Sequence, residues 1–251
     1  FQPIEVVKPF LIVILAIILC KNETNILFKY LASTILMTLV SLLLIIQPDI
    51  GQTLLVVFLW AVLIFCSGIN LYFLLTISSI GLILLSYMII YIPKFNYIKA
   101  RIFSFFDKET GTHNFQSDKA IESITSGGFF GKGIGEGTLK NRVPEAHTDY
   151  IISVISEEFG VIAIILILIL FLVLIYMVFK KISFETEEQN KLILIGSASL
   201  ILMQATIHIG VNIRLFPTTG MTLPFLSYGG SSIVSTSILT GIILNLTKRK
   251  I

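Results

Sequence analysis

Long apolar runs separated by polar connections organise most of this chain. Several of these runs approach or exceed the roughly 20 residues that a helix needs to cross a hydrocarbon core about 30 Å thick. Each run is expected to be helical, because lipid offers the backbone no hydrogen-bond partners and the alternating pattern of a membrane barrel is absent. The expected spans, about seven in number, are Val7–Cys20, Leu27–Ile46, Thr53–Ile69, Leu71–Ile92, Tyr150–Phe179, Leu192–Ile213 and Ser232–Thr247.

The composition agrees with a membrane protein. Of 251 residues, 55% are hydrophobic and only 13% are charged, whereas about a quarter of a soluble domain is charged. We therefore predict an all-α, polytopic transmembrane helical bundle that forms a single membrane domain over residues 1–251. The net charge of +3 is too small and too dispersed to indicate nucleic-acid binding. Cys20 and Cys66 lie in apolar segments and are interpreted as small buried hydrophobic residues.

Short connections give the expected orientation, because cytoplasmic loops carry an excess of Lys and Arg. Basic residues gather in alternate connections, at Lys21 and Lys29, at Lys180, Lys181 and Lys191, and at Lys248, Arg249 and Lys250. The opposite short connections contribute only Arg214. The pattern predicts a cytoplasmic C-terminus.

One connection, residues 93–149, is much longer than the others and is predicted to be a large extracytoplasmic loop. A connection of this length is usually functional or disordered. It contains Arg101, Lys132 and a glycine-rich stretch, Gly127–Gly135. Glycines let backbone N–H groups approach an anion closely. The spacing is not that of a P-loop, and a flexible re-entrant turn is the alternative interpretation.

The end of this loop, Pro144–Tyr150, places Glu145, His147 and Asp149 directly before an apolar run. Ionised groups are costly in lipid and usually face a cavity or a partner. The alternative is that Asp149 only caps the following helix. Glu157 and Glu158 lie two turns into the same run and must be paired, protonated or hydrated.

A second unusual segment, Pro217–Ser232, combines prolines, glycines and hydroxyl side chains beside an apolar run. Non-helical backbone at membrane depth is tolerated only inside protein or against a wet cavity. We expect this segment to line such a cavity, although a loop folded over a helix end would share the composition. Gln204, His208 and Asn212 share one helical face and are interpreted as a stripe that joins helices rather than a metal site.

Three passages together resemble the SEDS family of shape, elongation, division and sporulation proteins, which includes FtsW and RodA. They are FQPIE at residues 1–5 with Lys8, PEAHTDYIISVISEEFG at 144–160, and PTTGMTLPFLSYGGSS at 217–232. The last passage is most similar to the cell-division member, FtsW. The family usually has about ten transmembrane helices. Since the chain opens on a family motif without an initiator Met, we expect it to begin partway through a longer protein, with about three helices preceding it.

The resemblance implies a peptidoglycan glycosyltransferase that polymerises lipid II, the undecaprenyl-diphosphate-linked disaccharide pentapeptide, at the outer face of the bacterial inner membrane. Members of the family serve cell division or cell shape with a class B penicillin-binding protein and other divisome or elongasome proteins. A lipid II flippase and a scaffold for the transpeptidase are alternatives. The polar residues gather on the expected outer side, which favours chemistry there.

The resemblance also implies roles for individual residues. Asp149 matches the aspartate proposed as the catalytic base. The leaving diphosphate needs positive charge or N–H donors, and a divalent cation, Mg or Mn, could share this role. The expected substrate-binding residues are Lys8, Arg101, Lys132, Glu145, His147, Thr148, Ser227, Tyr228, Gly229, Gly230 and Ser231, with Glu5, Asp49 and Glu158 as further candidates. Arg214, where the family commonly has a small residue, departs from the pattern.

Overall fold

A computed structural model describes residues 2–21, 25–106 and 112–248. All regular secondary structure in these residues is helical, which confirms the predicted all-α fold class. Six helices are long and apolar enough to cross a membrane, and α3 is a shorter apolar helix of 17 residues. The helices that correspond to the expected spans are α1 (Pro3–Cys20), α2 (Ile26–Ile46), α3 (Ile50–Cys66), α4 (Leu71–Tyr91), α7 (Ile151–Ile182), α8 (Glu188–Asn212) and α9 (Gly230–Thr247).

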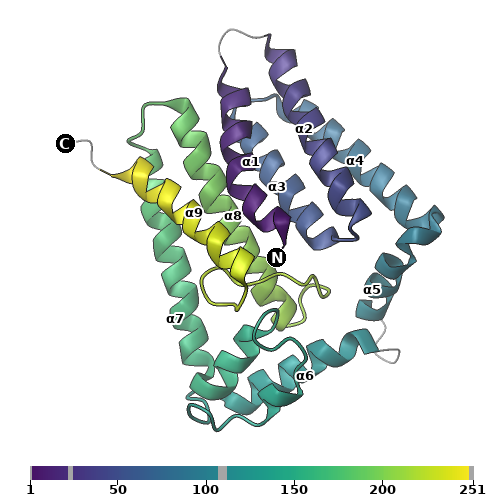
Figure 1. Cartoon of the computed structure of the whole chain (residues 1–251), viewed down its shortest axis with the longest axis vertical. Helices are drawn as coiled ribbons and strands as arrows, with labels where there is room; N and C mark the ends of the chain where they lie inside the picture. Colours follow the sequence, from purple (N-terminus) through teal and green to yellow (C-terminus); the bar gives the residue numbers. More distant parts are fainter. Residues whose placement is uncertain (1, 22–24, 107–111, 249–251) are drawn as a thin grey trace. The chain divides into compact units, whose positions relative to one another are not determined.

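The chain divides into two compact units. The first comprises Phe1–Gly81, Leu174–Met203 and Gly230–Ile251, and the second comprises Leu82–Val173 and Gln204–Gly229. In the first unit α1 packs against α9, α2 and α3 (Figure 1).

The core of the first unit is apolar and tightly packed. Ile12 on α1 and Leu63 on α3 are fully buried. A Cβ on Gly196 of α8 would stand 2.8 Å from Ile12 and 3.1 Å from Leu63, so this glycine permits a close helix approach. By contrast, Leu31 and Leu39 on α2 are largely exposed, as expected for side chains that face lipid.

The second unit contains the predicted long loop, which is not a simple connection. It includes a 3-10 turn (Pro93–Phe95), α5 (Asn96–Phe106), α6 (Thr112–Gly127) and a second 3-10 turn, η2 (Leu139–Arg142). The sequence pattern did not predict these helices. The buried face of α6 consists of small residues, Ser117, Ala120 and Ser123, so it lacks the large apolar side chains that normally reveal an amphipathic helix.

α6 lies beside the first turns of α7 (Figure 1). The hydroxyl of Ser117 is 3.4 Å from the hydroxyl of Tyr150. Ser123 donates to the main-chain oxygen of Ser153 at 3.2 Å. The long loop is therefore held against the start of a candidate membrane span.

Two helix boundaries differ from the expected ones in ways that matter for the site. α1 begins at Pro3 rather than at Val7, so Glu5 and Lys8 lie inside the helix instead of at its entrance. α7 contains a non-helical residue, Gly160, with φ 79° and ψ −179°, where the sequence pattern predicted an unbroken helix.

Candidate functional site

In the first unit, Lys8 forms a buried polar group with Glu5 and Gln52. The ammonium nitrogen of Lys8 lies 2.7 Å from Glu5 Oε2 and donates to Gln52 Oε1 at 3.1 Å. Gln52 Nε2 in turn donates to Glu5 Oε1 at 2.6 Å. Lys8, Glu5 and Gln52 are only 0%, 2% and 1% exposed. Such a buried ion pair requires additional hydrogen bonds to offset the cost of removing both charges from water, and Gln52 supplies them.

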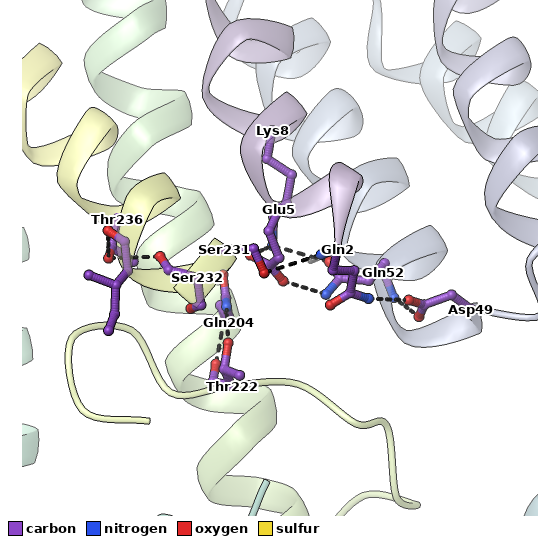
Figure 2. Close-up of polar contacts among 11 residues, drawn as sticks. Gln2, Glu5, Lys8, Asp49, Gln52, Gln204, Thr222, Ser231, Ser232 and Thr236 are labelled. Atoms are coloured by element: carbon purple, nitrogen blue, oxygen red, sulfur yellow. Dashed lines mark hydrogen bonds and ion pairs between the residues drawn. The ribbon is translucent and has the colours of Figure 1, made fainter. Parts of the chain in front are cut away.

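Figure 2 shows that this group continues toward the starts of α3 and α9. Gln2 Nε2 donates to Asp49 Oδ2 at 2.8 Å, and the Gln2 backbone N–H points at Ser231 Oγ at 3.4 Å. Asp49 also caps α3, because its Oδ1 accepts from the Gln52 backbone N–H at 3.1 Å. Gly230, the first residue of α9, is exposed, and Ser231 beside it is partly exposed. The predicted residues Lys8, Glu5, Asp49, Gly230 and Ser231 therefore all belong to the first unit.

In the second unit, Asp149 lies immediately before α7. This residue is half-buried, and its Oδ2 lies 3.6 Å from the position that a Cβ on Gly220 would occupy. Gly220 has φ +70°, a conformation that favours glycine. α7 begins at Ile151, two residues after Asp149. The aspartate carboxylate thus faces the turn of the Pro217–Gly229 segment.

Hydrogen bonds join this segment to residues 147–148. Ser227 is buried, and its hydroxyl donates to the Thr148 carbonyl oxygen at 2.6 Å. The hydroxyl oxygen of Ser227 also accepts from the Leu223 backbone N–H at 2.8 Å. The Tyr228 backbone N–H donates to the His147 carbonyl oxygen at 2.9 Å. Ser227 therefore positions the backbone beside Asp149.

Replacing Ser227 with alanine is expected to destabilise the protein by about 1–3 kcal/mol, because it leaves the buried Leu223 N–H without its acceptor. Thermal unfolding of the purified protein in detergent measures the effect. Ser237→Ala is the matched control, since Ser237 is an exposed residue of α9. Equal unfolding temperatures for the two variants would contradict the positioning role.

The remaining candidates around Asp149 present side chains to the outside. Glu145, His147 and Tyr228 are exposed, and Glu145 Oε2 accepts from the Thr148 hydroxyl at 3.0 Å. Gly229 is partly exposed. The side chains of Glu145, His147 and Tyr228 are therefore accessible to a ligand.

The polar stripe on α8 contacts the same region. Gln204 Nε2 donates to the Thr222 carbonyl oxygen at 3.1 Å (Figure 2), and His208 Nδ1 donates to the Met221 carbonyl oxygen at 2.7 Å. Asn212 Nδ2 donates to the Asp149 carbonyl oxygen at 3.0 Å. The stripe thus binds the irregular backbone at Met221 and Thr222 and the backbone of Asp149 just before α7.

Lys132, a candidate for binding a diphosphate, is paired with an acid. Its ammonium nitrogen lies 3.2 Å from Glu157 Oε1, and Glu157 is fully buried. Glu157 also accepts from Ser123 Oγ at 3.1 Å and from the Leu139 backbone N–H at 3.0 Å. Glu158 accepts from the Gly135 N–H at 3.2 Å. Both glutamates of α7 therefore hold the glycine-rich stretch, while the side chain of Arg101 lies outside the described part of the structure.

The glycines of this stretch allow close contact with the α7 backbone. A Cβ on Gly131 would stand 2.2 Å from the Glu158 carbonyl oxygen, and one on Gly160 would stand 2.2 Å from the Phe129 carbonyl oxygen. Both glycines also have positive φ values, +76° and +79°. They pack the loop against α7, a role that the sequence-based alternatives of anion binding and a flexible turn did not include.

Gly131→Ala and Gly160→Ala are each expected to destabilise the protein by at least about 2 kcal/mol, from overpacking against backbone and from left-handed strain. Gly241→Ala is the control, because a Cβ there meets nothing within 4 Å. Thermal unfolding is the measurement. If the three variants unfold at the same temperature, the close approach of loop and helix is not present.

Sequence reasoning missed Gln52 and Ser123 as parts of these groups. The available signal for Gln52 was its position close to an acid, within the first turn of an apolar helix. No group of three or more His, Cys, Asp or Glu residues that could hold a metal ion occurs among residues 2–21, 25–106 and 112–248.

These helices and contacts define a multi-pass helical membrane protein. The family model described as "Cell cycle protein", FTSW_RODA_SPOVE, matches residues 1–251. The chain belongs to this FtsW, RodA and SpoVE family, as the sequence motifs predicted.

Named relatives agree with the family assignment. The chain is 33% identical over 254 residues to the probable peptidoglycan glycosyltransferase FtsW of Caulobacter vibrioides, covering 99% of this chain and 63% of that protein. It is 30% identical to the protein of the same name from Enterococcus hirae, covering 100% of this chain and 66% of that protein. The chain thus spans about two thirds of the length of these relatives.

Solved structures show the same fold. A chain from a study of how a peptidoglycan synthase complex coordinates polymerisation and crosslinking aligns with a TM-score of 0.81 at 28% identity, over 98% of this chain and 70% of that chain. The rod shape determining protein RodA of Thermus thermophilus aligns with a TM-score of 0.66 at 28% identity, over 98% of this chain and 65% of that chain.

Proposed function

We propose that this chain carries the polymerising site of a peptidoglycan glycosyltransferase that joins lipid II into glycan strands. The observation that carries the proposal is the placement of Asp149. The residue is half-buried and precedes a membrane span, its carboxylate faces Gly220 in the Pro217–Gly229 segment, and its backbone carbonyl is held by Asn212. The names of the relatives support the same activity.

In the proposed reaction Asp149 accepts the proton of the 4-hydroxyl of the acceptor sugar. The oxygen forms a bond to the anomeric carbon of the donor, the bond from that carbon to the diphosphate oxygen breaks, and undecaprenyl diphosphate leaves with inversion. A positioned base of this kind contributes about 10²–10⁴-fold to the rate. Partial exposure of Asp149 suits a base that meets a lipid-linked substrate.

The substrate would contact the exposed side chains around Asp149. Glu145, His147 and Tyr228 are accessible, whereas Ser227 and the Thr148 carbonyl act by holding the backbone. For the leaving diphosphate we retain Lys8, Arg101 and Lys132 as candidates. Lys132 is paired with Glu157, so this pair would present little net charge to the diphosphate, whereas Lys8 and its partner Glu5 are buried.

We further propose the surroundings in which the site works. Residues 1–251 form one SEDS-type membrane domain, with residues 93–149 on the outer face of the bacterial inner membrane and the C-terminus in the cytoplasm. A class B penicillin-binding protein would crosslink the product. The likeness to a chain of a peptidoglycan synthase complex, in which polymerisation is coordinated with crosslinking, supports a partner of this kind.

The proposal is tested with the purified protein in its full natural length, together with its class B partner and labelled lipid II. Glycan strands separated by gel electrophoresis are the expected product. Lipid II that remains monomeric under conditions in which the folded complex is intact would contradict the proposed activity.

A further inference from the structure

The glycine-rich loop carries three large apolar side chains that face away from the protein. Phe129, Phe130 and Ile134 are 72%, 83% and 79% exposed. They lie in a stretch whose other residues are mainly glycines and charged residues. Exposed apolar groups gathered in one short loop indicate an interaction surface.

Backbone hydrogen bonds hold the loop beside residues 157–162 of α7. On one side of Gly160, the Lys132 N–H donates to the Glu157 carbonyl oxygen at 2.9 Å. On the other side, the Val161 N–H donates to the Gly128 carbonyl oxygen at 3.0 Å. The left-handed Gly160 interrupts the helix between these bonds, which makes N–H and C=O groups of α7 available to the loop. The height of the loop along α7 is therefore fixed.

The sequence of α7 shows where this height falls relative to a bilayer. The stretch Phe159–Phe179 contains no charged residue and is flanked by Glu157 and Glu158 at one end and by Lys180 and Lys181 at the other. A helix of that length extends about 31 Å, close to the roughly 30 Å of a hydrocarbon core. The boundary between water and hydrocarbon consequently lies near Gly160, level with the loop.

We propose that Phe129, Phe130 and Ile134 insert into the bilayer beside α7 and anchor the glycine-rich loop at the membrane boundary. The occupant of this surface is lipid. The exposed side chains of α7 at the same height, Phe159 and Ile162, continue the apolar surface into the span. Aromatic and large aliphatic groups are the usual means by which a segment enters the interfacial region.

The two carboxylates of α7 beside the loop are held by the loop. Glu157 is fully buried and paired with Lys132, so its charge does not face lipid. Glu158 is only partly exposed and accepts from the Gly135 N–H. The inference depends on the membrane-spanning character of α7 and not on the proposed catalytic activity.

Tryptophan fluorescence in nanodiscs tests the proposal. In the full-length natural protein every native tryptophan, including Trp60, is replaced by phenylalanine, and Phe130→Trp is then introduced. The Trp60 indole N–H makes no hydrogen bond to the part of the chain that the structure describes, so its replacement removes no such contact there. Thr138→Trp, at an exposed polar position after the loop, is the matched control.

Lipids brominated near the top of their acyl chains are expected to quench Phe130→Trp and to leave Thr138→Trp bright. Phe130→Trp should also show blue-shifted emission. Red-shifted emission with quenching by aqueous acrylamide alone would overturn the proposal, because it would place the loop in water. Protection from both quenchers would also overturn it, because a protein partner would then cover the loop. Ile134→Trp provides a second reporter if Phe130→Trp does not fold.

Discussion

Replacing Asp149 with asparagine is expected to lower glycan polymerisation by roughly 10²-fold or more, because the variant keeps the side-chain shape and loses the base. The fold should be retained, since the backbone contacts at Asp149 and Thr148 use carbonyl oxygens that the substitution leaves in place. Strand formation from labelled lipid II, measured with the full-length natural protein, gives the rate. Unfolding temperature and partner binding are measured on the same samples.

Asp118→Asn is the matched control for this experiment. Asp118 is an exposed carboxylate on α6 whose ion-pair partner is Arg214, and exposed pairs contribute only about 0–1 kcal/mol. The same chemical change should therefore leave strand formation nearly unaltered. An Asp149→Asn protein that polymerises at the wild-type rate would exclude Asp149 as the base.

Replacing Glu5 with glutamine is expected to destabilise the protein by about 3–5 kcal/mol, the usual cost of leaving one charge of a buried ion pair without its partner. Lys8 is completely buried, and Glu5 and Gln52 are acceptors that contact its ammonium group. Lys8→Met alone should have a similar effect on the unfolding temperature, because it leaves Glu5 charged. The double variant, Glu5→Gln with Lys8→Met, should recover much of the loss, since it removes both charges together.

Glu188 and Lys191 provide a control with the same spacing along a helix. Their ion pair is 2.8 Å long and partly exposed, so Glu188→Gln should change stability by less than about 1 kcal/mol. Thermal unfolding of the four variants forms a double-mutant cycle with its control. The coupling is absent if the double variant loses as much stability as the two single variants added together. Equal losses for Glu5→Gln and Glu188→Gln would contradict the larger contribution expected of the buried pair.

The membrane helices could be predicted from the sequence because a long apolar run that crosses lipid must satisfy its own backbone hydrogen bonds, and a helix does so. The ends of the helices could not. The expected span began at Val7, with Lys8 at its entrance and Glu5 before it, whereas α1 begins at Pro3 and contains both residues as an ion pair. A pattern of single residues does not reveal that two charges will neutralise each other.

The long loop shows the same limit. α6 buries Ser117, Ala120 and Ser123, and these small residues carry little signal in the sequence because hydroxyl groups can face either water or protein. Glu157 was recognised as a carboxylate in need of a partner. Its partners, Lys132 and Ser123, come from a loop and a helix whose folding the sequence did not predict.

The candidate site was partly predictable for a different reason. Pro144–Tyr150 and Pro217–Ser232 both stood out because polar or helix-breaking residues adjoin apolar spans. That they meet depends on hydrogen bonds between residues far apart in the sequence, such as Ser227 to Thr148. The expected contact of Ser227 with substrate stays a prediction, whereas the contacts of its hydroxyl with the backbone of Thr148 and Leu223 had no signal in the sequence.

We propose that this protein joins lipid II molecules at Asp149 rather than carrying them across the membrane. The most direct measurement follows both activities in one preparation of proteoliposomes that contain the full-length natural protein, its class B partner and labelled lipid II. Glycan strands are expected from the wild type and none from Asp149→Asn. Transfer of lipid II between leaflets that persists in Asp149→Asn, with no strands formed by the wild type, would contradict it.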